Sequence, residues 1–162
     1  MDQIRIIEYS QEYQEEIIEL ILSIQRGEFN VSITKEDQPD LKDIENFYQV
    51  KSGNFWIAIY HNQVIGTISL VDIGNGQGAL RKMFVKAPFR GKGYHTGKLL
   101  LQNLINWSKA HGISEIYLGT TEKFLAAHRF YEKNNFKQIC KEALPAAFPI
   151  MKVDTRFYHI DI

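Results

Sequence analysis

The amino-acid sequence predicts a mixed α/β fold, in which strands first follow one another and then alternate with helices. Two apolar runs, 55–60 and 64–71, flank His61-Asn62 and are typical of a β-hairpin. The apolar residues between 100 and 105 share one face of a helix. With 162 residues and 44% hydrophobic content, the chain is expected to form one domain, 1–162, with a core of its own.

The N-terminal third is expected to hold one strand and two helices. A short strand is predicted at 4–7, and apolar residues at helical spacing predict a helix over 13–25. Acidic residues in the first turn of this helix agree with its dipole, and Gly27 is expected to end it. The polar segment 28–40 predicts a loop, and 41–50 a second short helix.

The remaining elements follow from turn residues and apolar spacing. The glycine-rich segment 74–78 predicts a turn, and 80–85 a strand that Ala87-Pro88 ends. A helix is predicted over 94–111, with Gly112 as its C-cap. Strands and a helix then alternate, at 115–119 (strand), 123–134 (helix), 136–141 (strand) and 153–160 (strand).

The net charge is zero, since 19 basic residues balance 19 acidic ones, but the charges are segregated along the chain. Residues 1–72 carry −8, residues 73–114 carry +7 without a carboxylate, and residues 115–162 carry +1. Such a basic stretch favours an anionic ligand, although a basic surface without a ligand has the same pattern. Nucleic-acid binding is not expected, because the chain lacks a recognition motif and a basic overall balance.

The cysteine content and the hydropathy bear on location. Cys140 is the single cysteine, so it can form neither an internal disulfide nor, by itself, a zinc site. The longest strongly apolar run, 55–60, is far shorter than the roughly 20 residues of a membrane-spanning helix. The acidic N-terminus lacks the apolar core of a signal peptide. We therefore expect a cytoplasmic protein with no membrane association and no metal.

The most distinctive motif is a basic, glycine-rich turn between a predicted strand and a predicted helix, Arg90-Gly91-Lys92-Gly93. Helix N-termini offer unpaired N–H groups, and glycines let the backbone approach phosphate oxygens closely. A P-loop and a dinucleotide fingerprint are excluded, because Leu99 and Thr96 stand where those motifs need a hydroxyl residue and a glycine. The alternative is a tight turn with solvated bases.

This turn and a second block resemble the GNAT superfamily of acetyl-CoA-dependent N-acetyltransferases. The family turn, Gln/Arg-x-x-Gly-x-Gly/Ala, is matched by 90–94, with His95 in place of the last small residue. The family helix, Ala-x-x-x-Tyr-Glu-Lys-x-Gly-Phe, is matched by 127–136, with Asn135 in place of the glycine. The resemblance implies a mixed, mostly antiparallel central sheet of about six to seven strands flanked by about four helices.

The resemblance also implies acetyl-CoA as co-substrate. The backbone of 83–85 would pair with the pantetheine arm, the N–H groups of 91–96 would hold the pyrophosphate, and Arg129 would suit the 3′-phosphate. Phe124 stands where relatives often have Asn, so an amide contact to the arm is missing. The expected cofactor-binding residues are Met83, Phe84, Val85, Arg90, Gly91, Lys92, Gly93, Tyr94, His95, Thr96, Phe124, Ala127, Arg129 and Tyr131.

The implied reaction is acetyl transfer from the thioester to a primary amine, by direct attack in a ternary complex. An amine like that of lysine has a pKa of about 10.4 and must lose a proton first, whereas the leaving thiolate benefits from gaining one. Tyr131 is the family's candidate general acid, and Phe124, Ala127 and Tyr131 fall near one helical face. The alternative is that Tyr131 is a core aromatic residue.

The general base is open among Glu28, Glu36, Asp37, a histidine (His95 or His128) and water. The acidic N-terminal segment favours a cationic acceptor, such as a polyamine, an aminoglycoside or a peptide amine.

The apolar run 145–151 predicts a lip over the site, a core-packing loop or a homodimer contact. The alternative functions are a non-catalytic CoA-binding module, acting as a sensor or regulator, and a nucleic-acid binder that uses the basic stretch.

Overall fold

The protein is described by a computed structural model over residues 3–91 and 93–162. Seven strands form one sheet, in the order β1-β2-β3-β4-β5-β7-β6. All neighbouring strands are antiparallel except β4 and β5. The strands are β1 (Arg5–Glu8), β2 (Asn54–Tyr60), β3 (Gln63–Gly74), β4 (Gln77–Val85), β5 (Glu115–Thr120), β6 (Lys137–Ile139) and β7 (Arg156–Asp161).

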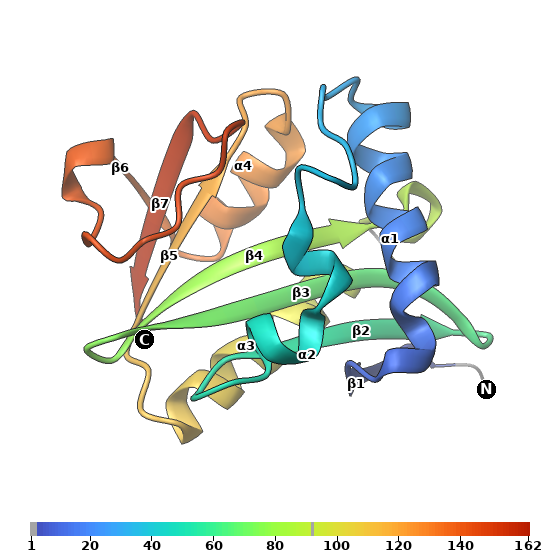
Figure 1. Ribbon diagram of the computed structural model, residues 1–162, viewed down its shortest axis with the longest axis horizontal. Coiled ribbons are helices and arrows are strands. Elements are labelled where there is room, and N and C mark those ends of the chain that lie inside the picture. The colour runs from blue at the N-terminus through green and yellow to red at the C-terminus, as the bar shows by residue number, and fades with distance from the viewer. Residues whose placement is uncertain (1–2, 92) are drawn as a thin grey trace.

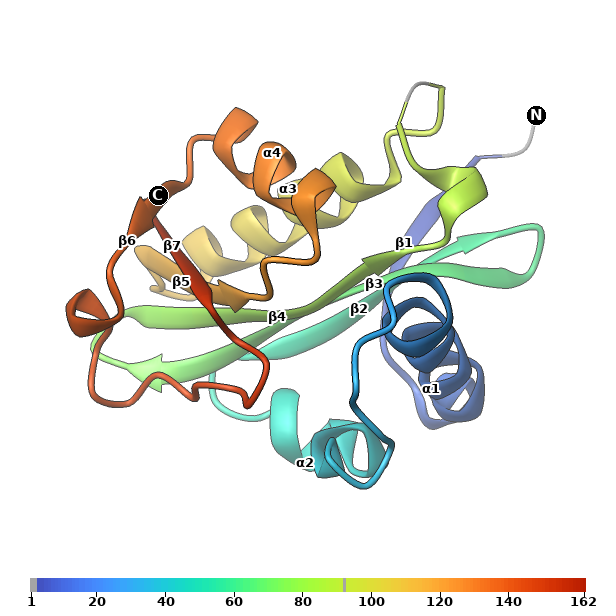
Figure 2. The same cartoon turned by 90° about the horizontal axis from the view of Figure 1, so that it is seen from above.

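Four α-helices cover the two faces of this sheet. They are α1 (Gln14–Leu22), α2 (Ile44–Tyr48), α3 (Thr96–Ala110) and α4 (Leu125–Lys133). Figures 1 and 2 show α1 and α2 on one face and α3 and α4 on the other. The expectation of a mixed, mostly antiparallel sheet with four helices is confirmed.

Each face of the sheet packs an apolar core against its helices. The α1 and α2 side buries Ile17, Ile21 and Tyr48 against β2, and the α3 side buries Leu100 and Leu104 among strand residues. In α1 and α3 these residues recur at the spacing of one helical face, as the sequence predicted. Because both faces are covered, β2 and β3 are buried over most of their lengths.

Two helix boundaries differ from the sequence-based expectation. Gly27 does not end the first helix, because a π-helical turn, Ser23–Glu28, extends it. The second predicted helix is divided into a 3₁₀ turn, Pro39–Lys42, and α2. Pro39 begins that turn, where its fixed φ is favourable, and the non-helical backbone of Asp43 (φ −146°, ψ 57°) separates it from α2.

The turn between β3 and β4 is tighter than the glycine content suggested. It consists of Asn75 and Gly76, whose φ angles are 57° and 70°. Two residues in the left-handed region match the twist of the flanking strands, so both strands extend into the predicted turn. The predicted hairpin turn at His61 and Asn62 has the same geometry, with φ angles of 50° and 59°.

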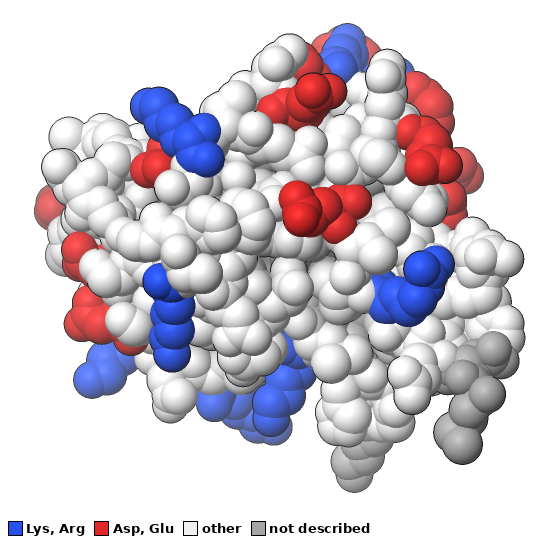
Figure 3. All heavy atoms as spheres, turned by 90° about the horizontal axis from the view of Figure 1, so that it is seen from below, with Lys and Arg blue, Asp and Glu red and all other residues white. Residues whose placement is uncertain are grey.

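The segregated charges of the sequence are visible on the surface. In the face drawn in Figure 3, several Lys and Arg side chains lie along the lower edge, on the α3 side of the sheet, and acidic side chains adjoin them at the left end of that edge. Other acidic side chains lie higher in this view, toward the α1 side. Within residues 3–91 and 93–162, no helix is both long enough and apolar enough to cross a membrane.

Candidate active site

A cavity lies where the parallel strands β4 and β5 separate. The two strands pair only through 77–79 of β4, and Figure 1 shows them diverging from this shared beginning. The cavity between them has a volume of about 90 Å³ and is lined by 80–84 of β4 and 119–121 at the end of β5. α4 and the segment 148–154 complete its walls. Ligands commonly bind outside the carboxyl ends of parallel strands.

A β-bulge in β4 brings two consecutive side chains to this cavity. Between the pairs Ser69–Arg81 and Thr67–Phe84, β4 holds two residues and β3 only one. Lys82 adopts a φ of 53°, in the left-handed region that costs a residue with a side chain about 1–2 kcal/mol. The Thr67 and Ser69 hydroxyls hold the bulge by donating to the Lys82 and Arg81 carbonyls, at 2.6 Å each. Arg81 and Lys82 therefore both line the cavity, although neighbours in a regular strand face opposite sides.

A buried cluster of charged and polar side chains surrounds these two cations. Asp40 Oδ2 accepts a hydrogen bond from the Tyr48 hydroxyl (2.5 Å) and lies 3.6 Å from Lys82 Nζ and 3.9 Å from Arg81 Nη2. Lys82 also donates to the side-chain oxygen of Gln38. The side chains of Arg81, Lys82 and Asp40 are only 8%, 5% and 4% exposed, so their charges are strongly felt within the cavity.

Burial sets the ionisation of this cluster. It lowers the pKa of Lys82 to about 8, although the nearby Asp40 carboxylate opposes the change. Burial also raises the pKa of Tyr48 and that of Asp154, a carboxyl that lines the cavity from the C-terminal segment.

Tyr131 of α4 reaches the cavity together with Ala127 and Phe124, as the helical spacing predicted. Tyr131 is 5% exposed and its ring packs against Phe136 and Tyr158. Burial raises the pKa of its hydroxyl well above the usual 10, so the phenol is protonated at neutral pH. Core packing and a place at the cavity wall are therefore both properties of Tyr131.

The glycine-rich turn owes its glycines to backbone conformation. Gly91 and Gly93 have φ angles of 78° and 95°, and a side chain at either would meet nothing within 4 Å. His95, with a φ of 54°, caps the N-terminus of α3 and is exposed. Thr96 is buried and donates to the Phe89 carbonyl at 3.0 Å. Lys92 lies outside the described residues.

The Arg90 guanidinium is already engaged. Its Nε donates to the Val85 carbonyl (2.7 Å), and its two Nη groups pair with both carboxylate oxygens of Glu28, one of them at 2.9 Å. The guanidinium carbon also lies 5.7 Å from the centre of the Phe29 ring. Arg90 thus ties the turn to the segment after α1, and Glu28 balances part of its charge.

The other expected cofactor residues lie on the surface around this turn and α4. Tyr94 is partly exposed and packs edge-on against Phe89 and Tyr60, with ring centres 5.1 Å and 5.8 Å apart. Arg129 is exposed on α4 and does not line the cavity. Met83 and Phe84 line the cavity, next to Val85 at the end of β4.

None of the candidate general bases lines the cavity. Glu28 pairs with Arg90, and Glu36 is exposed. Asp37 accepts hydrogen bonds from the Thr34 backbone N–H (3.0 Å) and hydroxyl (3.1 Å). His95 is exposed. His128 is buried. Its Nε2 donates a hydrogen bond to the Thr121 carbonyl (2.9 Å), and its Nδ1 accepts one from the Arg156 side chain of β7 (3.0 Å).

The apolar run 145–151 contributes both to the cavity and to the core. Phe148, Pro149 and Met151 line the cavity, as expected of a lip over the site. Phe148 is also 7% exposed and packs against Phe157, with ring centres 6.4 Å apart. A homodimer contact through this segment stays a prediction.

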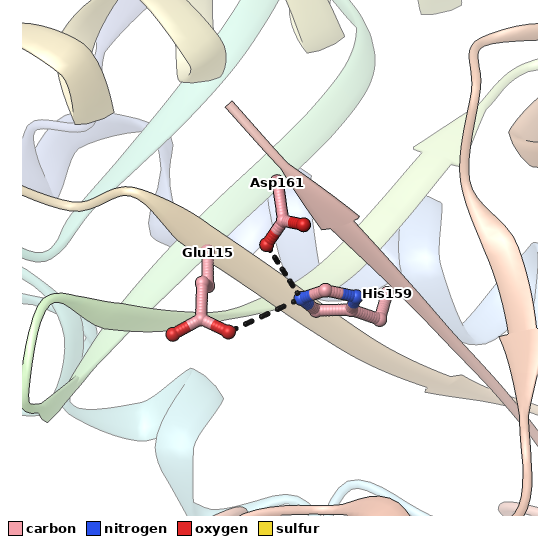
Figure 4. A group of neighbouring side chains, drawn as sticks. All are labelled: Glu115, His159 and Asp161. Atoms are coloured by element: carbon pink, nitrogen blue, oxygen red, sulfur yellow. Dashed lines mark ion pairs between the residues drawn. The ribbon is translucent and has the colours of Figure 1, made fainter.

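A separate ionisable cluster lies at the opposite end of β5. Figure 4 shows His159 between the carboxylates of Glu115 and Asp161, with its Nε2 3.3 Å and 3.2 Å from their oxygens. The pairing of β5 with β7 places Glu115 directly opposite Asp161. Hydrogen bonds, first of all from Gln77, lower the pKa of Glu115. Glu115 is four strand positions from the cavity-lining Gly119, and none of the three residues lines the cavity, so the cluster is no part of that site.

The buried cluster around Arg81 was not predicted from the sequence. Arg81 and Lys82 were treated as two of the basic residues of the stretch 73–114, and Asp40 was assigned to a polar loop. Two adjacent cations inside an otherwise apolar strand were the available signal. The bulge that turns both side chains inward depends on the pairing with β3, which the sequence does not reveal.

The sheet, the separating strands and the tyrosine at their gap define an acetyltransferase fold, and the comparisons agree. The model of the acetyltransferase (GNAT) family matches residues 18–136, more than half of the chain. The chain therefore belongs to the GNAT acetyltransferase family. The expectation of an N-acetyltransferase is confirmed at the level of the family.

Three similar proteins illustrate this membership. A GNAT-family acetyltransferase from Staphylococcus aureus Mu50 is 46% identical, with a TM-score of 0.94 over 98% of both chains. The PaiA N-acetyltransferase from Thermoplasma acidophilum, solved with coenzyme A, has the same fold, with 22% identity and a TM-score of 0.77 over 99% of both chains. N-acetylaspartate synthetase of Danio rerio is 34% identical over 102 residues, 62% of this chain and 36% of that protein. The chain thus spans about a third of the length of that curated relative.

Proposed function

We propose that this chain transfers an acetyl group from acetyl-CoA to a primary amine, by direct attack in a ternary complex. The observation that carries the proposal is the cavity between β4 and β5, where Tyr131 lies beside an open strand edge. The curated relative is an N-acetylaspartate synthetase, but this chain spans only about a third of that protein. The acceptor of this chain has to be argued from its own residues.

The separation of the strands supports the proposed cofactor position. Beyond residue 79, no described strand pairs with β4 on the side of β5. The backbone of 83–85 could therefore pair with the amides of the pantetheine arm, much as an added strand would. The N–H groups around Gly91, Gly93 and Thr96, at the start of α3, would hold the pyrophosphate. The backbone of His95 would contribute to the same pyrophosphate site. Arg129 and Lys92 would add positive charge for the 3′-phosphate of CoA.

The chemistry assigned to Tyr131 follows from its burial. The amine nitrogen forms a bond to the thioester carbonyl carbon, and the bond from that carbon to sulfur breaks. The amine loses one proton, and the leaving sulfur gains one from the Tyr131 hydroxyl, which recovers it from solvent. The hydroxyl carries a proton at neutral pH and can donate it, while burial raises its pKa and makes it a weaker acid than an exposed tyrosine. Which group accepts the amine proton stays a prediction.

We also propose that residues 1–162 work as one domain, in the cytoplasm and without a metal. These expectations rest on the length, the single cysteine and the family membership.

An acceptor screen tests the proposed function. The protein is incubated with acetyl-CoA and a panel of primary amines, and both free thiol and the mass of the acetylated amine are measured. Thiol release that depends on an amine and yields its acetylated form is the expected result. Saturable binding of acetyl-CoA without any acetylated product would contradict acetyl transfer and favour a CoA-binding sensor or regulatory module.

A further inference from the structure

The Arg81 side chain is buried in the cavity wall, where its guanidinium donates a hydrogen bond to a weak acceptor. Its guanidinium offers five N–H donors, whereas its hydrogen bond within the described residues goes from Nη2 to Met151 Sδ, at 2.8 Å. A thioether sulfur is a weak acceptor. Asp40 Oδ2, at 3.9 Å, is beyond hydrogen-bond distance. The side chain is 8% exposed, and a carboxylate would be a much stronger acceptor for its donors than this thioether.

The contacts on the other side of Arg81 hold it in place without using its donors. The guanidinium carbon lies 5.3 Å from the centre of the Phe47 ring and 5.9 Å from that of Tyr48. Stacking on aromatic faces orients the planar group and leaves its N–H edge free. This arrangement is typical of an arginine that receives a carboxylate through two parallel hydrogen bonds.

The charges that line the cavity point to the same ligand chemistry. Arg81 and Lys82 both enter from β4. Asp40, which is not in the cavity lining, faces these two cations and accepts a hydrogen bond from the Tyr48 hydroxyl. Asp154 lies on the other wall, against β5, where its Oδ2 accepts the Met151 N–H at 2.8 Å. Cations on one wall and a carboxyl on the other match an acceptor that carries a carboxylate and an amine.

We propose that Arg81 binds a carboxylate of the acceptor, so that the substrates are small amino-carboxylates, such as free amino acids, rather than polyamines or aminoglycosides. The inference rests on the proposed acetyl transfer, because it names the acceptor class of the same site. A polyamine would place additional positive charge next to Arg81 and Lys82.

Matched acceptors isolate the carboxylate. Glycine, alanine and β-alanine are each compared with their carboxamides, and spermidine serves as a cationic acceptor. We expect the acids to be acetylated with the lower KM. The Arg81→Met variant should raise that KM roughly tenfold to hundredfold, as for a lost hydrogen-bonded charge. It should change kcat/KM for the carboxamides by less than about twofold. Arg81→Lys should restore part of the preference, and the exposed Arg5→Met should change nothing.

Two results would overturn the inference. One is a wild-type preference for carboxamides or spermidine; the other is an equal loss on acids and amides in Arg81→Met, which would mean a structural role. If acetyl-CoA binds but no amine is acetylated, the proposed acetyl transfer is wrong. A binding measurement then decides whether Arg81 binds a carboxylate. Calorimetry with succinate on the CoA-loaded protein should show binding that Arg81→Met abolishes. Absence of succinate binding to the wild type would refute the anion site itself.

Discussion

The buried lysine of the cavity should make the protein more stable in alkaline solution, and Lys82→Met should remove this effect. Burial lowers the pKa of Lys82 from 10.5 to about 8 in the folded chain. Between these two values the unfolded chain holds a proton that the folded chain has lost, so the free energy of unfolding rises with pH. The gain across this window is about 3 kcal/mol, at roughly 1.4 kcal/mol for each tenfold change in proton affinity.

The assay is urea denaturation of wild type and Lys82→Met at several pH values from 7.5 to 10.5. Other groups also titrate in this range, so the difference between the two proteins is the relevant quantity. We expect the wild type to gain about 3 kcal/mol over the variant across the range. The exposed Lys109→Met serves as the matched control and should show a constant difference. A constant difference for Lys82→Met as well would refute the buried, paired position of this lysine beside Asp40 and Arg81.

Three further substitutions test other contacts. Tyr131→Phe should lower kcat by about a hundredfold or more in the thiol-release assay, because it removes a proton donor, and should leave the Kd for acetyl-CoA unchanged. Gly119→Ala places a Cβ 2.6 Å from Asp154 Oδ2, so the free energy of unfolding should fall by about 1–3 kcal/mol in urea. Glu28→Gln breaks a half-exposed ion pair with Arg90 and should cost at most about 1 kcal/mol, with a smaller effect in 1 M salt.

The controls for these variants follow from the same geometry. Tyr13→Phe removes a hydroxyl outside the cavity and should leave kcat unchanged; unaltered turnover in Tyr131→Phe would remove the tyrosine from the proton transfer. Gly27→Ala meets nothing within 4 Å and should not destabilise the chain. A Gly119→Ala protein as stable as wild type would show that Asp154 moves freely. A salt-independent loss in Glu28→Gln would argue against an electrostatic contact.

Most of the fold could be predicted from the sequence because its signals are local. The α3 helix shows its apolar face at 100–105, and the hairpin of β2 and β3 is indicated by two residues that tolerate the left-handed region. Helix boundaries were predicted incorrectly where the backbone hydrogen bonding depends on distant partners. The π-helical turn at 23–28 and the break at Asp43 have no marker in their own residues.

The site could be predicted only as far as sequence motifs reach. The glycine-rich turn and the helix with Tyr131 were found, because backbone conformation and helical spacing restrict their residues. Arg90 was expected among the cofactor-binding residues, and its pairing with Glu28, which joins residues 62 positions apart, was not predicted. The meeting of Asp40 with Lys82 likewise depends on tertiary packing and on a bulge in β4.

The charge pattern along the chain and the charges of the cavity favour different acceptors, because exposure decides which charges a ligand experiences. Residues 1–72 carry a net charge of −8, which favoured a cationic acceptor. Among the described acids of this segment, however, Asp40 is the buried one, and it faces two cations. Exposed carboxylates act through water and are screened by salt within about 10 Å, whereas buried charges interact at a much lower effective dielectric constant. The few desolvated charges of the cavity therefore outweigh the many on the surface, and they favour an acceptor that brings a carboxylate.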